Sequence, residues 1–271
     1  MVRLFLMMFM FTAIPFPGTG AAAQEQPPAF QAVRAAQPPA IDGEFGDPVW
    51  SLAPMITGFT QRDPHEGEAA TQKTFVQIAY DDEALYVAAR MEDEGAVTSQ
   101  LGRRDSALES DSFRIFLDPQ LDRRSGFHFG VYASNVQYDA VLFNDTNADR
   151  EWDAVWSSET RITPNGWNAE MRIPLSQLRF PDRSVHTWGV NAQRYVSRLN
   201  ELSRLVHVAT TESGFVSRFA RLTGIEGIRP RRTFELLPYA VTRLDRRETV
   251  SPLDPFTDRT EHGAQIGLDL K

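Results

Sequence analysis

The stretch Val76–Met91, which reads VQIAYDDEALYVAARM, decides the fold class of this chain. Apolar side chains stand at every second position on both sides of Asp81–Glu83. Side chains two residues apart in a strand point to the same face of a sheet. The acidic triplet between the two runs is typical of a turn. The stretch therefore predicts a β-hairpin with one face turned toward a core.

The same alternation recurs along most of the chain and predicts an all-β protein. Further strands are expected near Phe113–Leu117, Phe127–Ala133, Gln137–Phe143, Trp167–Ile173 and Trp188–Ala192. Gly, Pro, Asn and Asp residues separate these short runs, and long helices are hard to place, although Pro174–Leu178 could hold one turn. Such spacing favours an antiparallel β-sandwich over units in which strands and helices alternate.

Composition narrows the functions that need to be considered. The chain has 271 residues, a formal charge of −8 and no cysteine. The absence of cysteine excludes a thiol nucleophile, a cysteine-based zinc site and a disulfide framework. The acidic balance argues against a nucleic-acid partner, whose binding surface is usually basic. The sequence also lacks the common serine-hydrolase, phosphate-loop, dinucleotide and HExxH signatures.

The first 39 residues are expected to direct export and to tether the folded domain. Arg3 precedes an apolar run, Leu4–Ile14, that is too short to span a bilayer as a helix. Ala21–Ala23 supply the small residues that a signal peptidase requires. We therefore predict a signal peptide over residues 1–23, a Pro-rich tether over 24–39 and the sandwich domain over 40–226.

The character of the sequence changes after residue 226. Phe234–Arg243 is strand-like, and apolar residues alternate with polar ones from Ala264 to Lys271. This alternation fits a transmembrane barrel strand and an edge strand of a soluble sheet equally well. Because the pattern continues to the last residue, we expect the sequence to be the front part of a longer protein.

The most site-like stretch of the sequence is Asn144–Trp156. Asp145, Asn147 and Asp149 place side-chain oxygens at alternating positions, as the loop of a calcium site does. The residues that follow do not complete an EF-hand, which requires Gly at its sixth position and Glu at its twelfth. The three residues are therefore candidate calcium ligands, and a solvated turn rich in Asn and Asp is the competing interpretation.

The aromatic residues around this stretch predict a carbohydrate-binding surface. Trp152 and Trp156 flank the acidic loop. Sugars pack their C–H faces on aromatic rings while polar side chains bind their hydroxyls. Tyr138 and Asp153 complete the candidate binding set. Either tryptophan could instead belong to the core, and the strand-like spacing of Trp156 favours that alternative more strongly.

Several motifs resemble the family 9 carbohydrate-binding modules. They are Ile41–Glu44 with Asp47–Trp50, Ala79–Val87, Asp111–Phe113 and Phe116–Pro119. Other motifs resemble more particularly an uncharacterised bacterial family in which such a module precedes a large outer-membrane β-barrel. These are Trp152–Trp156, Gly166–Trp167, Glu170–Leu175, Leu178–Phe180, Trp188–Gly189, Gly214–Phe219, Gly227–Pro230 and Glu235–Tyr239.

The resemblance implies a jelly-roll-like β-sandwich with a polysaccharide or oligosaccharide ligand and a link to carbohydrate catabolism. In characterised modules of this kind two tryptophans hold a terminal sugar and calcium ions stabilise the fold. Trp50 and Trp167 match positions that look structural, which leaves Trp152 and Trp156 as candidates. The resemblance also implies that residues 227–271 begin a β-barrel in the outer membrane, with the module in the periplasm. It implies no catalytic residue.

Three functions remain open from the sequence. Non-catalytic sugar binding requires exposed aromatic rings with charged neighbours. A structural or plug-like domain of the barrel, without a ligand, would bury all five tryptophans. An exported glycoside hydrolase would require two carboxylates that converge in a cleft.

Overall fold

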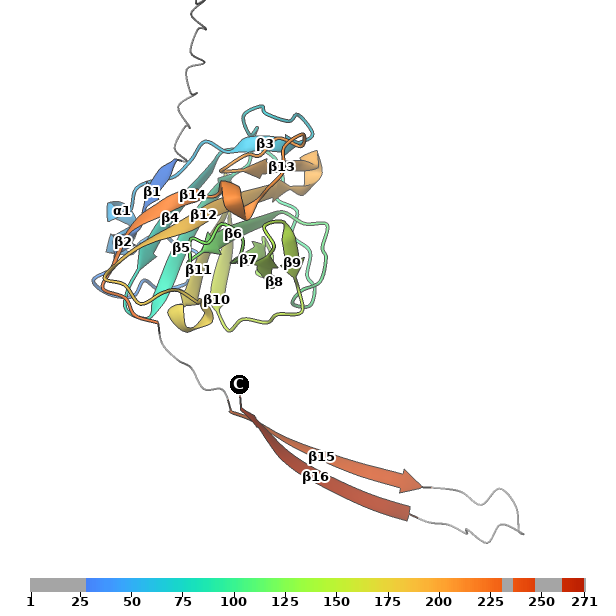
Figure 1. Ribbon diagram of the computed structural model, residues 1–271. Helices are drawn as coiled ribbons and strands as arrows, with labels where there is room; N and C mark the ends of the chain where they lie inside the picture. Colours follow the sequence, from blue (N-terminus) through green and yellow to red (C-terminus); the bar gives the residue numbers. More distant parts are fainter. Residues whose placement is uncertain (1–27, 231–235, 247–259, 271) are drawn as a thin grey trace, which may run out of the picture.

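The computed structural model describes residues 28–230, 236–246 and 260–270, and about half of these residues form β-strands. Residues 28–230 form two sheets that pack face to face (Figure 1). This arrangement confirms the predicted antiparallel β-sandwich. The predicted signal peptide, residues 1–23, lies outside the described residues.

The larger sheet carries the surfaces that matter for function. In the described part of the chain it has nine strands in the order β1-β14-β12-β6-β7-β8-β9, and β13 joins β12 to β3. Its strands are β1 (Ala29–Gln31), β3 (Thr60–Asp63), β6 (Ser112–Asp118), β7 (Gly126–Tyr132), β8 (Gln137–Phe143), β9 (Asn147–Asp149), β12 (Val185–Val196), β13 (Glu201–Arg204) and β14 (Ala220–Glu226). Consecutive strands β6, β7 and β8 pair as an antiparallel meander.

The smaller sheet contains the hairpin predicted from the sequence. Over residues 28–230 it has five strands in the order β10-β11-β5-β4-β2. They are β2 (Val33–Arg34), β4 (Thr74–Tyr80), β5 (Ala84–Glu92), β10 (Ser157–Thr163) and β11 (Gly166–Pro174). Val76 lies opposite Ala89, and Ile78 lies opposite Val87. Helical structure in this range is short: α1 (Pro48–Leu52) and the 3-10 turns η1 (Leu175–Gln177), η2 (Ser197–Leu199) and η3 (Val216–Arg218).

Part of the predicted tether is strand. β1 pairs in parallel with β14 of the larger sheet, and β2 pairs in parallel with β4 of the smaller sheet. Ala32, between them, is buried in the main core. This segment therefore connects the two sheets. An edge strand of each sheet pairs with its backbone, and the small side chain of Ala32 fits between the sheets.

Glu170 explains why the Ile41–Glu44 motif and Trp50 occur together. One Glu170 oxygen accepts a hydrogen bond from Trp50 Nε1 at 2.8 Å, and the other accepts the amides of Asp42 and Gly43 at 3.0 and 2.9 Å. Burial raises the pKa of Glu170 to about 7, although these three hydrogen bonds oppose the shift. The motif thus anchors the start of the domain to β11, and its role is structural.

The C-terminal segment forms a separate hairpin. β15 (Leu236–Arg246) and β16 (Thr260–Leu270) pair with each other as a two-stranded antiparallel sheet. Figure 1 shows this hairpin apart from the two sheets of the sandwich. Leu244, Ile266 and Leu268 are exposed on it. The extended strands agree with the alternation in the sequence, whereas the β-barrel stays a prediction. No helix among the described residues is both long and apolar enough to cross a membrane.

Candidate functional site

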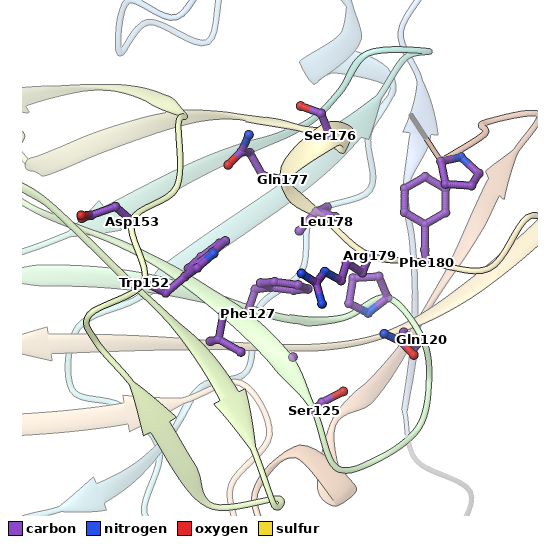
Figure 2. Close-up of a pocket in the computed structure, with 14 residues that line it drawn as sticks. Gln120, Ser125, Phe127, Trp152, Asp153, Ser176, Gln177, Leu178, Arg179 and Phe180 are labelled. Carbon is purple, nitrogen blue, oxygen red and sulfur yellow. The ribbon is translucent and has the colours of Figure 1, made fainter. Parts of the chain in front are cut away.

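An end cavity lies beside Trp152, between the start of β7 and the turn η1 (Figure 2). Its volume is about 570 Å³. It is lined by Pro119, Gln120, Ser125, Gly126, Phe127, Val141, Trp152, Asp153, Ser176, Gln177, Leu178, Arg179, Phe180 and Pro230. The cavity combines aromatic and apolar walls with amide, hydroxyl and guanidinium groups, a combination that suits a polar organic ligand.

Trp152 is half-buried, and its ring packs against the core. Its ring centroid lies 5.2 Å from that of Phe127 and 6.1 Å from that of Phe129. Figure 2 shows the Asp153 carboxylate directed away from the Trp152 ring. Asp153 instead lies 3.8 Å from Arg104 Nε. The structure therefore brings Trp152 and Asp153 to one cavity, but their polar and aromatic groups do not converge there.

Trp156 and Tyr138 lie elsewhere. Trp156 is 7% exposed, packs against Phe129 with ring centroids 5.5 Å apart, and donates from Nε1 to Asp139 Oδ2 at 2.9 Å. Tyr138 is buried on the outer face of β8, which points away from the smaller sheet. The four predicted sugar-binding residues are thus divided between the end cavity, the core and the outer face of the larger sheet.

A second depression, which we call the outer-face groove, lies on the outer face of the larger sheet and has a volume of about 390 Å³. It is lined by Arg62, Arg114, Phe116, His128, Leu142, Thr146, Ala148, Arg150, Gln193, Arg204, Val208, Ala209, Thr210, Glu212, Gly214 and Phe215. Strand register places Arg204, Gln193, Arg114, Gly130 and Tyr138 side by side on β13, β12, β6, β7 and β8. The groove itself is lined from the same five strands by Arg204, Gln193, Arg114, His128 and Leu142, and Tyr138 adjoins it.

Arg114 is held in place by Tyr138. Its Nε donates to the Tyr138 hydroxyl at 2.8 Å, and its guanidinium lies 4.8 Å from the centre of the Tyr138 ring. A Cβ atom on Gly130 would lie only 2.3 Å from Tyr138 Cζ. Gly130 thus leaves the space that the tyrosine ring needs to cross β7 and reach Arg114.

Arg204 is fixed in the same manner on the other side of the groove. Its Nε donates to Gln193 Oε1 at 3.1 Å, and its guanidinium lies 4.9 Å from the centre of the Phe215 ring. Burial lowers the pKa of Arg204 to about 10, and the nearby charges of Arg62 and Arg114 act in the same direction. The group still carries its charge at neutral pH.

The predicted calcium ligands support the groove in a different way. Asp145 Oδ1 accepts the amides of Phe215 and Ser217 at 3.0 and 2.8 Å, and Oδ2 accepts the Ser217 hydroxyl at 2.9 Å. Burial raises the pKa of Asp145, but these hydrogen bonds outweigh it and the net shift is downward. Asp145 thus fixes the turn that carries Phe215.

The donors that surround Asp145 do not suit a cation. Asn147 and Asp149 are exposed on β9, and Asp149 Oδ1 accepts the amide of Glu151 at 3.0 Å. Within the described ranges no group of three His, Cys, Asp or Glu side chains is placed to hold a metal. The residues present therefore do not fit a calcium site built on Asp145, Asn147 and Asp149.

The charged and aromatic residues of the groove were not singled out by sequence reasoning. Arg114 sits between Phe113 and Ile115 in a strand, so its alternation marks it as outward-facing. Phe215 lies within a motif of the family resemblance. Nothing in the sequence shows that Arg204 and Arg114 would lie on either side of β12, because their positions depend on the order of the strands.

Comparison with known proteins identifies the family. Residues 41–204, more than half of the chain, match the family described as carbohydrate family 9 binding domain-like. The chain belongs to this family. A search of curated protein sequences found no match.

Solved structures share the fold of this family 9 module. A family 9 carbohydrate-binding module from Caldicellulosiruptor kristjanssonii in complex with cellotriose has a TM-score of 0.54 and 21% identity, over 75% of this chain and 94% of that one. The same organism's module in complex with glucose has a TM-score of 0.52 and 21% identity, over 74% and 96% of the two chains. A protein from Bacteroides uniformis described as carbohydrate-binding has a TM-score of 0.59 and 11% identity, over 74% of this chain and 100% of that one.

Proposed function

We propose that this family 9 module binds an oligosaccharide in the outer-face groove as a non-catalytic step of carbohydrate catabolism. The observation that carries the proposal is the lining of the groove by side chains from five adjacent strands, among which Arg114 and Arg204 each lie over an aromatic ring. The module from Caldicellulosiruptor kristjanssonii that shares this fold was solved with cellotriose and with glucose. That likeness supports a saccharide as the ligand.

The groove has the two kinds of group that a sugar requires. Phe215 is half-buried and presents part of its ring beside the groove, where the C–H face of a sugar can pack. Arg114, Gln193 and Arg204 offer planar donors and acceptors to hydroxyl groups. Because the three polar side chains stand on paired strands and bond to neighbours, little conformational freedom is lost when a ligand binds.

The end cavity with Trp152 and Asp153 is the second candidate for the sugar. Trp50, Trp156, Trp167 and Trp188 are all buried, so Trp152 is the one tryptophan of the five that is partly exposed. A purely structural domain was expected to bury all five. The exposure of Trp152 therefore favours a binding surface over the plug-like alternative, without deciding between the groove and the cavity.

Calorimetry on paired variants tests the site. We expect Phe215→Ala to weaken binding of cellotriose or a xylan-derived trisaccharide roughly fivefold, since one stacking face contributes about 1 kcal/mol. Trp152→Ala should leave this affinity unchanged. The opposite pattern would move the site to the end cavity, and the absence of binding to any neutral or acidic oligosaccharide would remove the proposed function.

We also propose that the protein is exported and that residues 227–271 begin an outer-membrane β-barrel, with the module in the periplasm. Pairing in the hairpin places Ala240 and Leu244 on the same face as Ala264, Ile266 and Leu268, which gives that face an apolar character. Such alternation is typical of lipid-facing barrel positions. Cell fractionation of the full chain, with mass analysis of its mature N-terminus, tests both points. Cytoplasmic protein that retains residues 1–23 would contradict them.

A glycoside hydrolase gains no support from the buried acids. Asp93 forms ion pairs with Arg194 and Arg198, Asp139 pairs with Arg104, and Glu170 accepts three internal hydrogen bonds. These carboxylates are occupied by interactions that stabilise the fold.

A further inference from the structure

We propose that the outer-face groove selects acidic saccharides, and that Arg114 and Arg204 bind the carboxylates of hexuronic acid units. The inference rests on the proposed function, because it names the class of sugar that the same groove takes.

The charges that line the groove are unbalanced. Four arginines, Arg62, Arg114, Arg150 and Arg204, face one acid, Glu212. Glu212 is already paired with Arg218 at 3.2 Å, and Arg62 lies 3.5 Å from Asp63. The remaining three groove arginines make no ion pair with any residue that the structure describes. Positive charge thus exceeds negative charge within the groove, although the net charge of the chain is −8.

Two of these arginines are oriented for recognition of a planar anion. In both Arg114 and Arg204, Nε donates one hydrogen bond and one face of the guanidinium lies over an aromatic ring. Their terminal nitrogens have no hydrogen-bond partner in the described ranges. A guanidinium held in this way offers two parallel N–H groups, the geometry that binds a carboxylate in bidentate fashion.

The groups around the groove show the effect of this positive field. His128, on its floor, is buried, and its pKa is lowered to about 3, first by burial and then by the charges of Arg114 and Arg150. His128 is therefore neutral at pH 7 and adds no charge. A bound carboxylate would compensate the arginines, whereas a neutral sugar would leave them uncompensated in a partly buried site.

The spacing of the two arginines fits an oligosaccharide better than a small anion. Arg204 and Arg114 stand on β13 and β6, with β12 between them. Two strand spacings separate their backbones by roughly 9–10 Å. One small anion cannot receive bidentate hydrogen bonds from both side chains unless they bend together, while two acid groups on one oligosaccharide can each occupy one arginine.

Matched ligands test the inference by calorimetry. Trigalacturonic acid and its fully methyl-esterified form have the same sugar rings and differ in charge. We expect the acid to bind at least tenfold more tightly than the ester or cellotriose, and this advantage to shrink between 50 mM and 500 mM NaCl because screening weakens charge pairing. Equal affinity for acid and ester would overturn the inference and leave the proposed function intact. No binding of any of the three would instead count against the proposed function.

Matched variants locate the interaction. Arg114→Gln and Arg204→Gln should each reduce affinity for trigalacturonic acid about tenfold and affinity for its ester much less. Arg204→Lys, which keeps the charge but loses the fork, should fall between them and the parent. Arg183→Gln is the control, since Arg183 is exposed and does not line the groove. An equal loss in the control would show attraction by net charge alone and overturn the inference. Thermal midpoints of all variants verify that they fold.

Discussion

The two faces of strands β6, β7 and β8 have opposite chemistry, although their residues alternate one by one. Toward the smaller sheet, Phe113, Ile115 and Phe129 are fully buried in the core. On the other face, Arg114 and His128 line the outer-face groove, and Tyr138 lies beside it and holds Arg114. The same backbone thus holds a rigid apolar layer and, one residue away, an array of polar groups.

This contrast separates the consequences of substitution. A side chain on the inner face contributes contacts that unfolding removes, so its loss lowers the free energy of unfolding. A groove side chain with accessible polar atoms contributes mainly to a ligand, so its loss changes affinity. A residue that packs in the core and also lines a cavity can affect both stability and binding.

The largest effect is expected for Trp156→Ala on the inner face. The ring is buried against Phe129 and its Nε1 donates to Asp139 Oδ2, so truncation leaves a cavity and removes one buried hydrogen bond, although Arg104 still pairs with that oxygen. We expect a loss of about 3–5 kcal/mol in the free energy of unfolding, measured with urea. Val155→Ala is the control, since Val155 is 68% exposed and should change stability by less than about 0.5 kcal/mol. A stable Trp156→Ala that no longer binds sugar would restore Trp156 to the site.

The next effect concerns His128, which is buried although it lies on the outer face. Its pKa is about 3 in the folded protein and about 6.5 when unfolded, so the native state binds fewer protons between these values. The free energy of unfolding is therefore not reduced by His128 above about pH 6.5, and it falls as the pH decreases toward 3. At pH 4.5 the loss relative to pH 7 should be about 2–3 kcal/mol.

Comparison with His128→Gln isolates this contribution. The pKa of Glu170 is raised, so that group gives a dependence of opposite sign, in which stability falls as the pH rises from about 4.5 to about 7. The variant retains the Glu170 effect and lacks that of His128. If parent and variant lose the same stability on acidification, His128 is not the buried neutral group that the structure places there.

Alternation in the sequence predicted the sandwich because strands with one buried face must repeat every second residue. The hairpin of β4 and β5 follows directly from that rule. β1 and β2 could not be found in this way, since they are three and two residues long and pair in parallel with distant strands. Their strand structure comes from the edges that the rest of the fold provides.

The site was harder to predict than the fold. Trp152 was selected by its position beside an acidic loop, and the structure does place it at a cavity. Arg114 and Arg204 are far apart in sequence and become neighbours through the order β13-β12-β6. Alternation shows which face a side chain takes, but strand order decides which side chains meet.

Trp152 lies between the two cases and should show a smaller loss of stability than Trp156. Its ring packs on Phe127 and Phe129, yet part of it faces the end cavity. We expect Trp152→Ala to cost about 1–3 kcal/mol by urea unfolding, less than a full core truncation. Trp152→Phe should recover most of this loss. A cost equal to that of Trp156→Ala would place Trp152 in the core and leave the end cavity without an aromatic platform.

The smallest change in stability, with a measurable change in binding, is expected for Gly130→Ala. The added methyl group would meet Tyr138 Cζ at 2.3 Å, so the ring must move, and with it the hydroxyl and ring face that hold Arg114. Replacing glycine in a strand restrains the unfolded chain and offsets part of this strain, so the free energy of unfolding should change by less than about 1 kcal/mol. Affinity for the oligosaccharide should nevertheless fall severalfold, because Arg114 loses its fixed orientation. Gly46→Ala is the matched control, since its added methyl group would have no neighbour within 4 Å. Unchanged affinity in Gly130→Ala would mean that Tyr138 does not position Arg114 for binding, and the distinction between a structural and a functional face would then fail at the centre of the groove.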